Sequence, residues 1–209
     1  MNALQDYLRF AVTLTAVLDP FLAVPIFLTV TASRSPARRA ALVRIVVITV
    51  FSVLAAAALL GEQLLLYVGA SLSAFRVGGG LVLLLMALAM LNAQAGGVRQ
   101  SQAEAKALES GELPGVVPLA VPLLAGPGAI STTIIAAQSG GWIHVAAVIT
   151  CVAIVCALTW VVLTLAHPIG ARMGATGLNV ATRLLGLLLA ALAIQTMAEG
   201  LKELFPGLG

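Results

Sequence analysis

Hydrophobic residues occur along this chain in six long stretches, which shorter polar segments separate. The stretches cover residues 8–30, 42–60, 76–91, 116–137, 143–165 and 181–198. Apolar runs of about 20 residues are long enough to cross a bilayer as helices. The pattern therefore predicts an all-α integral membrane protein with six transmembrane helices.

The composition agrees with this prediction. Of the 209 residues, 61% are hydrophobic and only 9% are charged, whereas soluble domains carry about 25% charge. Six spans leave no room for a soluble domain, so we expect residues 1–209 to form one membrane domain that contacts membrane lipid. The formal net charge of +3 calls for no nucleic-acid partner, because membrane topology accounts for the basic residues.

The two halves of the chain resemble each other at one offset. Three pairs of residues are each 107 positions apart. They are Asp19 and Gly126, Arg76 and Arg183, and Gly79 and Gly186. Each half holds three spans, and an odd number of spans inverts the second half in the membrane. We predict two inverted three-helix repeats at about 1–95 and 114–209, joined by a polar connecting loop at about 96–113. The alternative is that duplication built only a symmetric scaffold.

The lysines and arginines predict the orientation, because cytoplasmic loops hold the excess of these residues. With six spans, one side of the membrane receives three basic residues, which are Arg9, Arg76 and Lys202. The other side receives eight, which are Arg34, Arg38, Arg39, Arg44, Arg99, Lys106, Arg172 and Arg183. Both termini are therefore expected outside the cytoplasm.

The first apolar stretch carries an acid and two prolines near its middle, at Asp19, Pro20 and Pro25. Proline removes a backbone donor and breaks or kinks a helix, and it favours the first position of a new helix, where aspartate favours the N-cap. An acid at this depth costs about 2.5–3.5 kcal/mol on insertion scales. We expect a break here. Asp19 either caps the second half-helix alone or also contacts a substrate, a coupling proton or a sodium ion.

The fourth stretch contains a matching break at Gly126 and Pro127. Proline can start a half-helix there, and the exposed amides of its first turn attract an anion such as a carboxylate. A kink that serves only packing is the alternative.

Because the two breaks occupy equivalent positions, a zwitterion would meet a negative group at one and a positive helix end at the other. Gln195, inside the sixth stretch, is a further site candidate or an interhelical hydrogen-bonding residue. The candidate substrate-binding residues are Asp19, Pro20, Pro25, Gly126, Pro127, Gly128, Ala129, Ile130, Ser131, Thr132 and Gln195. The glycines at 78–80 and 186 are expected to let helices approach closely.

The sequence offers little for other kinds of chemistry. It lacks a complete Gly-x-Ser-x-Gly or His-Glu-x-x-His motif, so we expect no enzyme, no catalytic residues and no cofactor. His144 and His167 flank the fifth stretch, too far apart for a local metal motif.

At these motifs the chain resembles the MarC family of membrane proteins, also described as neutral amino acid transporters. The similar segments are FRVGGG at 75–80, PLAVPLLAGPGAI at 118–130 and RLLGLLLAA at 183–191. The family's motif Asp-Pro-x-Gly-Asn-x-Pro is matched at Asp19, Pro20 and Pro25, with Leu22 and Ala23 in place of its Gly and Asn.

The resemblance implies a multi-pass protein of the bacterial inner membrane that transports small neutral amino acids such as alanine or glycine. A transporter that exports another small solute or a drug and a non-transporting membrane scaffold are the alternatives. The oligomeric state stays open, a homo-oligomer included.

Overall fold

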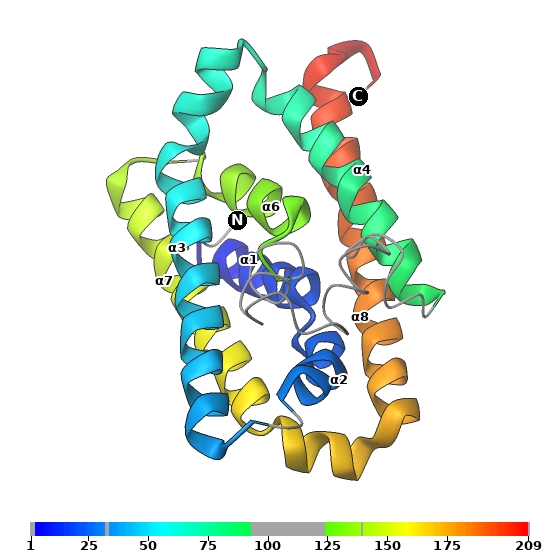
Figure 1. The fold of residues 1–209 in the computed structure, drawn as a ribbon. Coiled ribbons are helices and arrows are strands. Elements are labelled where there is room, and N and C mark those ends of the chain that lie inside the picture. The colour runs from blue at the N-terminus through cyan, green and yellow to red at the C-terminus, as the bar shows by residue number, and fades with distance from the viewer. Residues whose placement is uncertain (1–2, 32–33, 93–123, 139, 209) are drawn as a thin grey trace.

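A computed structural model describes residues 3–31, 34–92, 124–138 and 140–208. The predicted connecting loop at 96–113 and residues 116–123 of the fourth apolar stretch lie outside these ranges. The regular elements of the described part are all helical (Figure 1). They are α1 (Ala3–Leu18), α2 (Pro20–Thr31), α3 (Pro36–Val68), α4 (Leu72–Leu91), α6 (Pro127–Ala137), α7 (Trp142–Thr164), α8 (Ala166–Leu204) and the short 3₁₀ helix η2 (Pro206–Leu208).

Within these described ranges, five helical stretches are long and apolar enough to cross a membrane. The first of them, Leu4–Leu28, takes in both α1 and α2, and the others are α3, α4, α7 and α8. Helix α6 is apolar but has only 11 residues. The predicted all-α class is confirmed, and the helices suit an integral membrane protein.

The helices extend beyond the predicted apolar stretches, because single residues outside those stretches determine where a helix begins, ends or bends. Helix α3 begins at Pro36, after an extended Ser35, and ends where Gly69 adopts a left-handed φ of 75°. Its 33 residues span about 50 Å, so the predicted stretch at 42–60 is too short. The prediction at 181–198 is also too short, because α8 begins at Ala166 and bends at Gly174, where φ is 60°.

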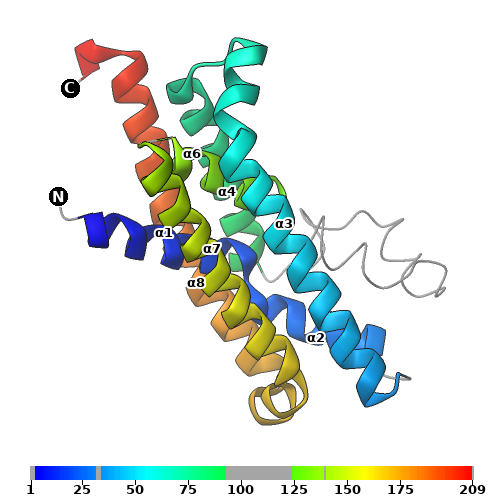
Figure 2. The same ribbon diagram turned by 90° about the vertical axis from the view of Figure 1, so that its left-hand side faces the viewer.

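The long helices surround the short ones. Helices α3 and α7 pack together on one side of the molecule, and α4 and α8 pack together on the other. Helices α1, α2 and α6 lie between these two pairs and contact both of them. Figure 2 shows α1 crossing the direction of the long helices. The centre of the protein is thus built from short helices with buried faces.

Helices α4 and α8 approach closely through glycines. A Cβ atom at Gly80 would lie 2.5 Å from Cγ of Met197, and one at Gly186 would lie 2.8 Å from Cβ of Met90. A Cβ at Gly78, in contrast, meets no neighbouring atom within 4 Å. The predicted packing role is therefore confirmed for Gly80 and Gly186.

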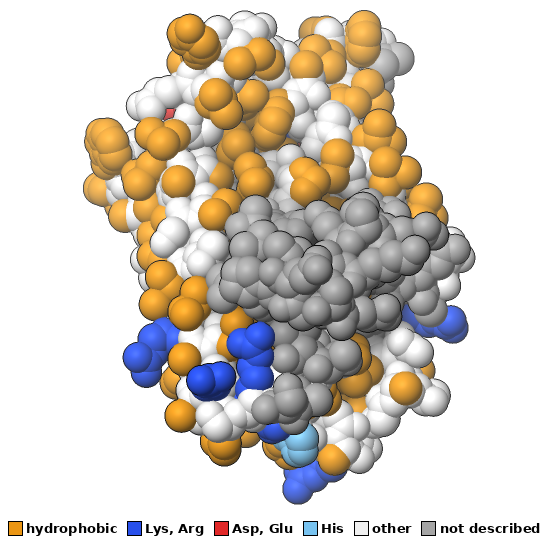
Figure 3. Space-filling model, in the orientation of Figure 1, with side chains coloured by type: hydrophobic (Ala, Val, Ile, Leu, Met, Phe, Trp, Pro, Cys, Tyr) orange, Lys and Arg blue, Asp and Glu red, His pale blue; other side chains and the backbone are white. Residues whose placement is uncertain are grey.

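The surface is divided into an apolar body and a basic end. Figure 3 shows basic side chains gathered where α3 begins and α7 ends, with hydrophobic side chains over much of the remaining face. The arginines of the described residues around the start of α3 are Arg34, Arg38, Arg39 and Arg44. Large exposed apolar side chains, such as Leu66, Ile154, Leu184 and Leu187, suit contact with lipid.

Candidate substrate-binding site

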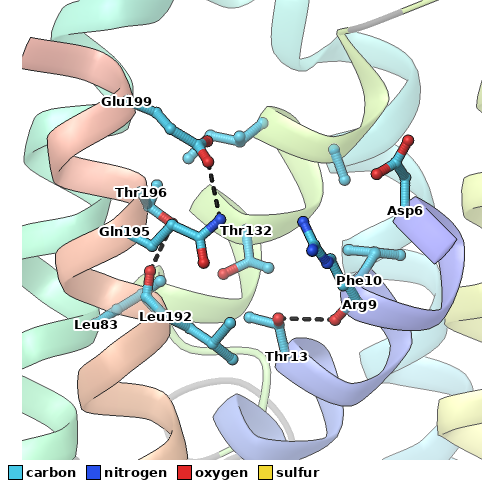
Figure 4. Close-up of a pocket in the computed structure, with 12 residues that line it drawn as sticks. Asp6, Arg9, Phe10, Thr13, Leu83, Thr132, Leu192, Gln195, Thr196 and Glu199 are labelled. Carbon is cyan, nitrogen blue, oxygen red and sulfur yellow. Dashed lines mark hydrogen bonds between the residues drawn. The ribbon is translucent and has the colours of Figure 1, made fainter. Parts of the chain in front are cut away.

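A cavity of about 280 Å³ lies between helices α1, α4, α6 and α8 (Figure 4). It is open to the surface, and both charged and apolar side chains line it. The lining residues are Asp6, Arg9, Phe10, Thr13, Leu83, Thr132, Ile135, Ala136, Leu192, Gln195, Thr196 and Glu199.

Helical periodicity explains how these side chains meet. The four residues from α1 stand at positions i, i+3, i+4 and i+7, and so do the four from α8. Residues at this spacing share one face of a helix. On another face of α1, Leu4, Leu8 and Val12 are exposed. Helix α1 thus has a polar face on the cavity and an apolar face outside it.

The cavity carries charges of both signs. Arg9 extends its guanidinium into the space between α1 and α8, Asp6 lies beside it on α1, and Glu199 approaches from α8 (Figure 4). Within the described residues, no ion pair joins Arg9 to either carboxylate. The cation and the two carboxylates are therefore available to opposite ends of a zwitterion.

Uncharged polar groups complete the lining. Gln195 donates from Nε2 to Oε1 of Glu199 across 3.0 Å. The Thr13 hydroxyl donates to the Arg9 carbonyl and the Thr132 hydroxyl to the Gly128 carbonyl, each at 2.8 Å. A hydroxyl has one proton to give, so these threonine oxygens can only accept further hydrogen bonds. These oxygens suit an ammonium group. The hydrogen bonds to a substrate carboxylate must be donated by Arg9 and Gln195.

A second cavity of about 240 Å³ adjoins the first and shares six of its residues, among them Asp6 and Glu199. Its additional residues are Tyr7, Arg76, His144 and Val148. Arg76 forms an ion pair through Nη1 with Glu203. Its buried Nε atom has no hydrogen-bond partner among the described residues, so a second guanidinium borders the same space.

Two of the predicted site residues, Thr132 and Gln195, line the first cavity. The first-stretch candidates Asp19, Pro20 and Pro25 lie apart from both cavities. Asp19 stands between α1 and α2, is fully buried, and has a positive φ of 41°. Its Oδ1 accepts a hydrogen bond of 3.2 Å from the Leu22 amide. This is the N-cap arrangement, with Pro20 as the first residue of α2.

The start of α6 is covered by α4. Gly126 is the N-cap and Pro127 the first helical residue, and the Ile130 amide donates to the Gly126 carbonyl at 3.1 Å. A Cβ at Gly128 would lie 2.5 Å from Sδ of Met86. Five of the candidates here, which are Gly126, Gly128, Ala129, Ser131 and Thr132, are buried. Only Thr132 among them reaches the cavity.

The charged residues of this lining, Asp6, Arg9 and Glu199, were not among the predicted site residues. The available signal was the spacing of Asp6, Arg9 and Thr13, three polar residues on one helical face in a mainly apolar segment. It was missed because the first span was placed from residue 8 onward, whereas α1 begins at Ala3.

Comparison with known proteins agrees with this architecture. The model of the MarC family, described as "MarC family integral membrane protein", matches residues 4–205. The UPF0056 membrane protein YvbG of Bacillus subtilis is 38% identical over 93% of this chain and 93% of its own. The UPF0056 membrane protein YhcE of Escherichia coli is 32% identical over 97% of this chain and 94% of its own.

No solved structure matches the chain. The family match nevertheless covers nearly its whole length, and the relatives align with it from end to end. This chain therefore belongs to the MarC family of integral membrane proteins.

Proposed function

We propose that this protein is a secondary transporter of small neutral amino acids, such as alanine and glycine, across the bacterial inner membrane. The observation that carries the proposal is the cavity that places the guanidinium of Arg9 opposite the carboxylate of Glu199. Charged side chains are rare in membrane helices and mark substrate or ion pathways when they face the bundle interior or a water-filled cavity.

The chemistry of the cavity matches a small zwitterion. The carboxylate of an amino acid would pair with Arg9, a charge-assisted hydrogen bond worth about 1.5–3 kcal/mol. The ammonium group would lie beside Glu199 on α8. Pockets for drug-sized ligands measure about 300–1,000 Å³. The 280 Å³ of this cavity and the apolar Phe10, Ile135 and Leu192 favour a substrate with a small apolar side chain.

The proposed inverted repeat has support in the packing of equivalent helices. Helix α3 pairs with α7, and α4 pairs with α8, each pair running antiparallel (Figure 1). Met90 packs on Gly186 while Met197 packs on Gly80. The two methionines are 107 positions apart, which is the offset of the repeat. Gly80 is the neighbour of Gly79, which is the strict counterpart of Gly186, so the two contacts correspond to within one residue. A two-fold axis in the membrane plane would produce such a correspondence.

The transport path that we propose runs from the cavity toward the two helix breaks. Thr132 lines the cavity and lies one turn along α6 from Gly128, beside the break at Gly126 and Pro127. In transporters with inverted repeats, the substrate site lies near the membrane midplane at such breaks. The cavity is then the outer binding position, and the breaks at Asp19 and Gly126 form the deeper one.

The proposed orientation follows from the charge at each end. The start of α3 and the first part of α8 carry Arg38, Arg39 and Arg172, with no acidic residue in either. The end where α3 and α8 finish carries Glu62, Lys202 and Glu203. By the positive-inside rule, the first end faces the cytoplasm. The C-terminus, which follows α8, then lies on the opposite side with the N-terminus.

Uptake by the whole protein in proteoliposomes tests the function. The wild type should accumulate radiolabelled alanine. Arg9→Gln should raise the alanine concentration for half-maximal uptake at least about tenfold, which corresponds to about 1.4 kcal/mol. Arg38→Gln, at the basic end, is the control and should leave uptake unchanged. A wild type that takes up neither alanine nor glycine would overturn the proposal, and equal uptake by Arg9→Gln would overturn the site.

A further inference from the structure

His144 joins three helices at the edge of the second cavity. It lies in the first turn of α7, its Nδ1 is 2.8 Å from the hydroxyl oxygen of Tyr7 on α1, and its Nε2 is 2.7 Å from the carbonyl oxygen of Ala136 on α6. We propose that His144 binds the proton that drives transport, and that the Tyr7 hydroxyl relays this proton from the cavity. The inference rests on the transport function proposed above.

The hydrogen bonds define the neutral state of the ring. A carbonyl oxygen only accepts, so Nε2 must carry a hydrogen to bond with Ala136. In neutral histidine the other nitrogen is then an acceptor. Tyr7 therefore donates its O–H to Nδ1, and this leaves the hydroxyl with no proton to offer the cavity.

Protonation reverses the bond between the two side chains. A proton from the solvent in the cavity goes to the Tyr7 oxygen, and the original hydroxyl proton moves to Nδ1. The ring gains one proton in total, and Tyr7 stays a neutral phenol. Nδ1–H now donates to the Tyr7 oxygen, whose new O–H can turn toward the cavity. Protonation thus creates a donor that a substrate carboxylate can use, while the ring keeps its contacts with α1 and α6.

Titratable and charged groups border the second cavity from several of the helices around His144. Helix α1 contributes the Asp6 carboxylate, α8 contributes Glu199, and α4 contributes Arg76, which already pairs with Glu203. Helix α6 presents only its backbone carbonyl, and on α7 the nearby titratable group is the Cys151 thiol, 4.0 Å from the Tyr7 carbonyl oxygen.

The proton and the substrate share part of one lining. Asp6, Thr196 and Glu199 border both cavities. An imidazolium and a freed Tyr7 hydroxyl both attract a carboxylate, so protonation should tighten amino acid binding. By thermodynamic linkage, bound amino acid must favour protonation by the same factor. This reciprocity is the property that a proton-coupled transporter requires.

Gradient-driven uptake and exchange separate coupling from substrate binding. In proteoliposomes with an inward proton gradient, the wild type should accumulate alanine, and His144→Gln should lose at least about 90% of this accumulation, a tenfold effect. Exchange of internal for external alanine without a gradient should persist in His144→Gln, which also shows that the variant is folded. His167→Gln is the matched control, because His144 and His167 are the two histidines of the chain and His167 lines a separate cavity between α2, α3, α7 and α8.

Nitrogen NMR of the His167→Gln protein gives a second readout, because its remaining histidine signal comes from His144. Saturating alanine at constant pH should increase the imidazolium fraction of His144. Tyr7→Phe, which lacks the hydroxyl, should reduce this increase. The proton site is overturned if His144→Gln accumulates alanine like the wild type, if sodium alone drives uptake, or if alanine leaves the imidazolium fraction unchanged. A wild type without any alanine uptake would instead overturn the transport function, and the coupling role with it.

Discussion

The side chain of Met197 occupies the space in which a side chain at position 80 would begin, with its Cγ 2.5 Å from the Cβ position of Gly80. The carbonyl oxygen of Ala193 is also only 3.0 Å from that position. Helices α4 and α8 can therefore lie this close only while residue 80 has no side chain. The close approach holds one wall of the candidate site, because Leu83 comes from α4 and Gln195 from α8.

Enlarging Gly80 should destabilise the protein. Gly80→Leu forces α4 away from α8, and overpacking of this kind lowers the free energy of unfolding by about 1–3 kcal/mol. Gly78→Leu is the matched control, because a Cβ at Gly78 meets no atom within 4 Å. Thermal unfolding in detergent measures both variants. Equal unfolding temperatures for the two would contradict the packing described for α4 and α8.

Asp19→Ala should reduce stability, whereas Asp19→Asn should not. Alanine loses the bond from Oδ1 to the Leu22 amide and tolerates the positive φ of 41° less well than aspartate or asparagine. Loss of an N-cap alone lowers the unfolding free energy by about 0.5–2 kcal/mol. Asparagine keeps the cap, so alanine binding to Asp19→Asn should stay within about twofold of wild type. A tenfold loss would instead make Asp19 a partner of the substrate ammonium.

Glu199→Gln should weaken the binding of ligands that carry an ammonium group. The variant keeps the size of the side chain but removes its charge, so alanine binding should weaken about tenfold. The affinity for propionate, which has the carboxylate but no ammonium group, should fall much less. Competition with radiolabelled alanine measures both ligands, and Glu62→Gln at the end of α3 is the control. Equal losses for alanine and propionate would remove Glu199 from the ammonium site.

A side chain at Gly140 should disturb the proposed proton site. A Cβ there would lie 2.7 Å from Cβ and 2.9 Å from Cγ of His144, so Gly140→Ala must displace the ring from Tyr7 and Ala136. Proton-driven alanine accumulation should fall at least about tenfold, while exchange without a gradient continues. Gly141→Ala is the neighbouring control, since a Cβ at Gly141 meets nothing within 4 Å. Loss of accumulation in both variants would point to a general defect at the start of α7.

The proposed orientation can be read from cysteine labelling in intact cells. A membrane-impermeant maleimide should label Glu62→Cys from outside and should label Arg38→Cys only after the membrane is opened. The native Cys151 and Cys156 lie within α7, where Cys156 is buried, so the unsubstituted protein gives the background. The reverse pattern would place the basic end outside and refute the proposed topology.

The sequence predicted the helices well because apolar length reports directly on the membrane. It placed the helix ends less well because these depend on single residues. The left-handed Gly69 ends α3 and the left-handed Gly174 bends α8, and neither conformation can be read from hydropathy. Asp19 and Pro20 were recognisable as a helix boundary because both residue types have strong preferences there.

The candidate site was predictable only in part. Thr132 and Gln195 are polar residues within apolar runs, and they drew attention for that reason. The role of Arg9 depends on the meeting of α1 with α8, two helices from opposite ends of the chain. Residue spacing shows that Asp6, Arg9 and Thr13 share a face, but it does not show what this face contacts. That information belongs to tertiary packing.

The junction at Asp19 has a mechanical consequence for the membrane around the protein. Helices α1 and α2 are joined through this one residue, and they lie inside a frame of long helices that carries much of the exposed apolar surface. A pivot of α1 about the backbone torsions of a single aspartate would alter access to the interior while the outer helices keep their tilt. Lipids next to the frame would keep their positions, so the bilayer would add little elastic resistance to each cycle. The work of opening would then fall on α1 and the side chains around it, while the surface of the outer frame stays unchanged.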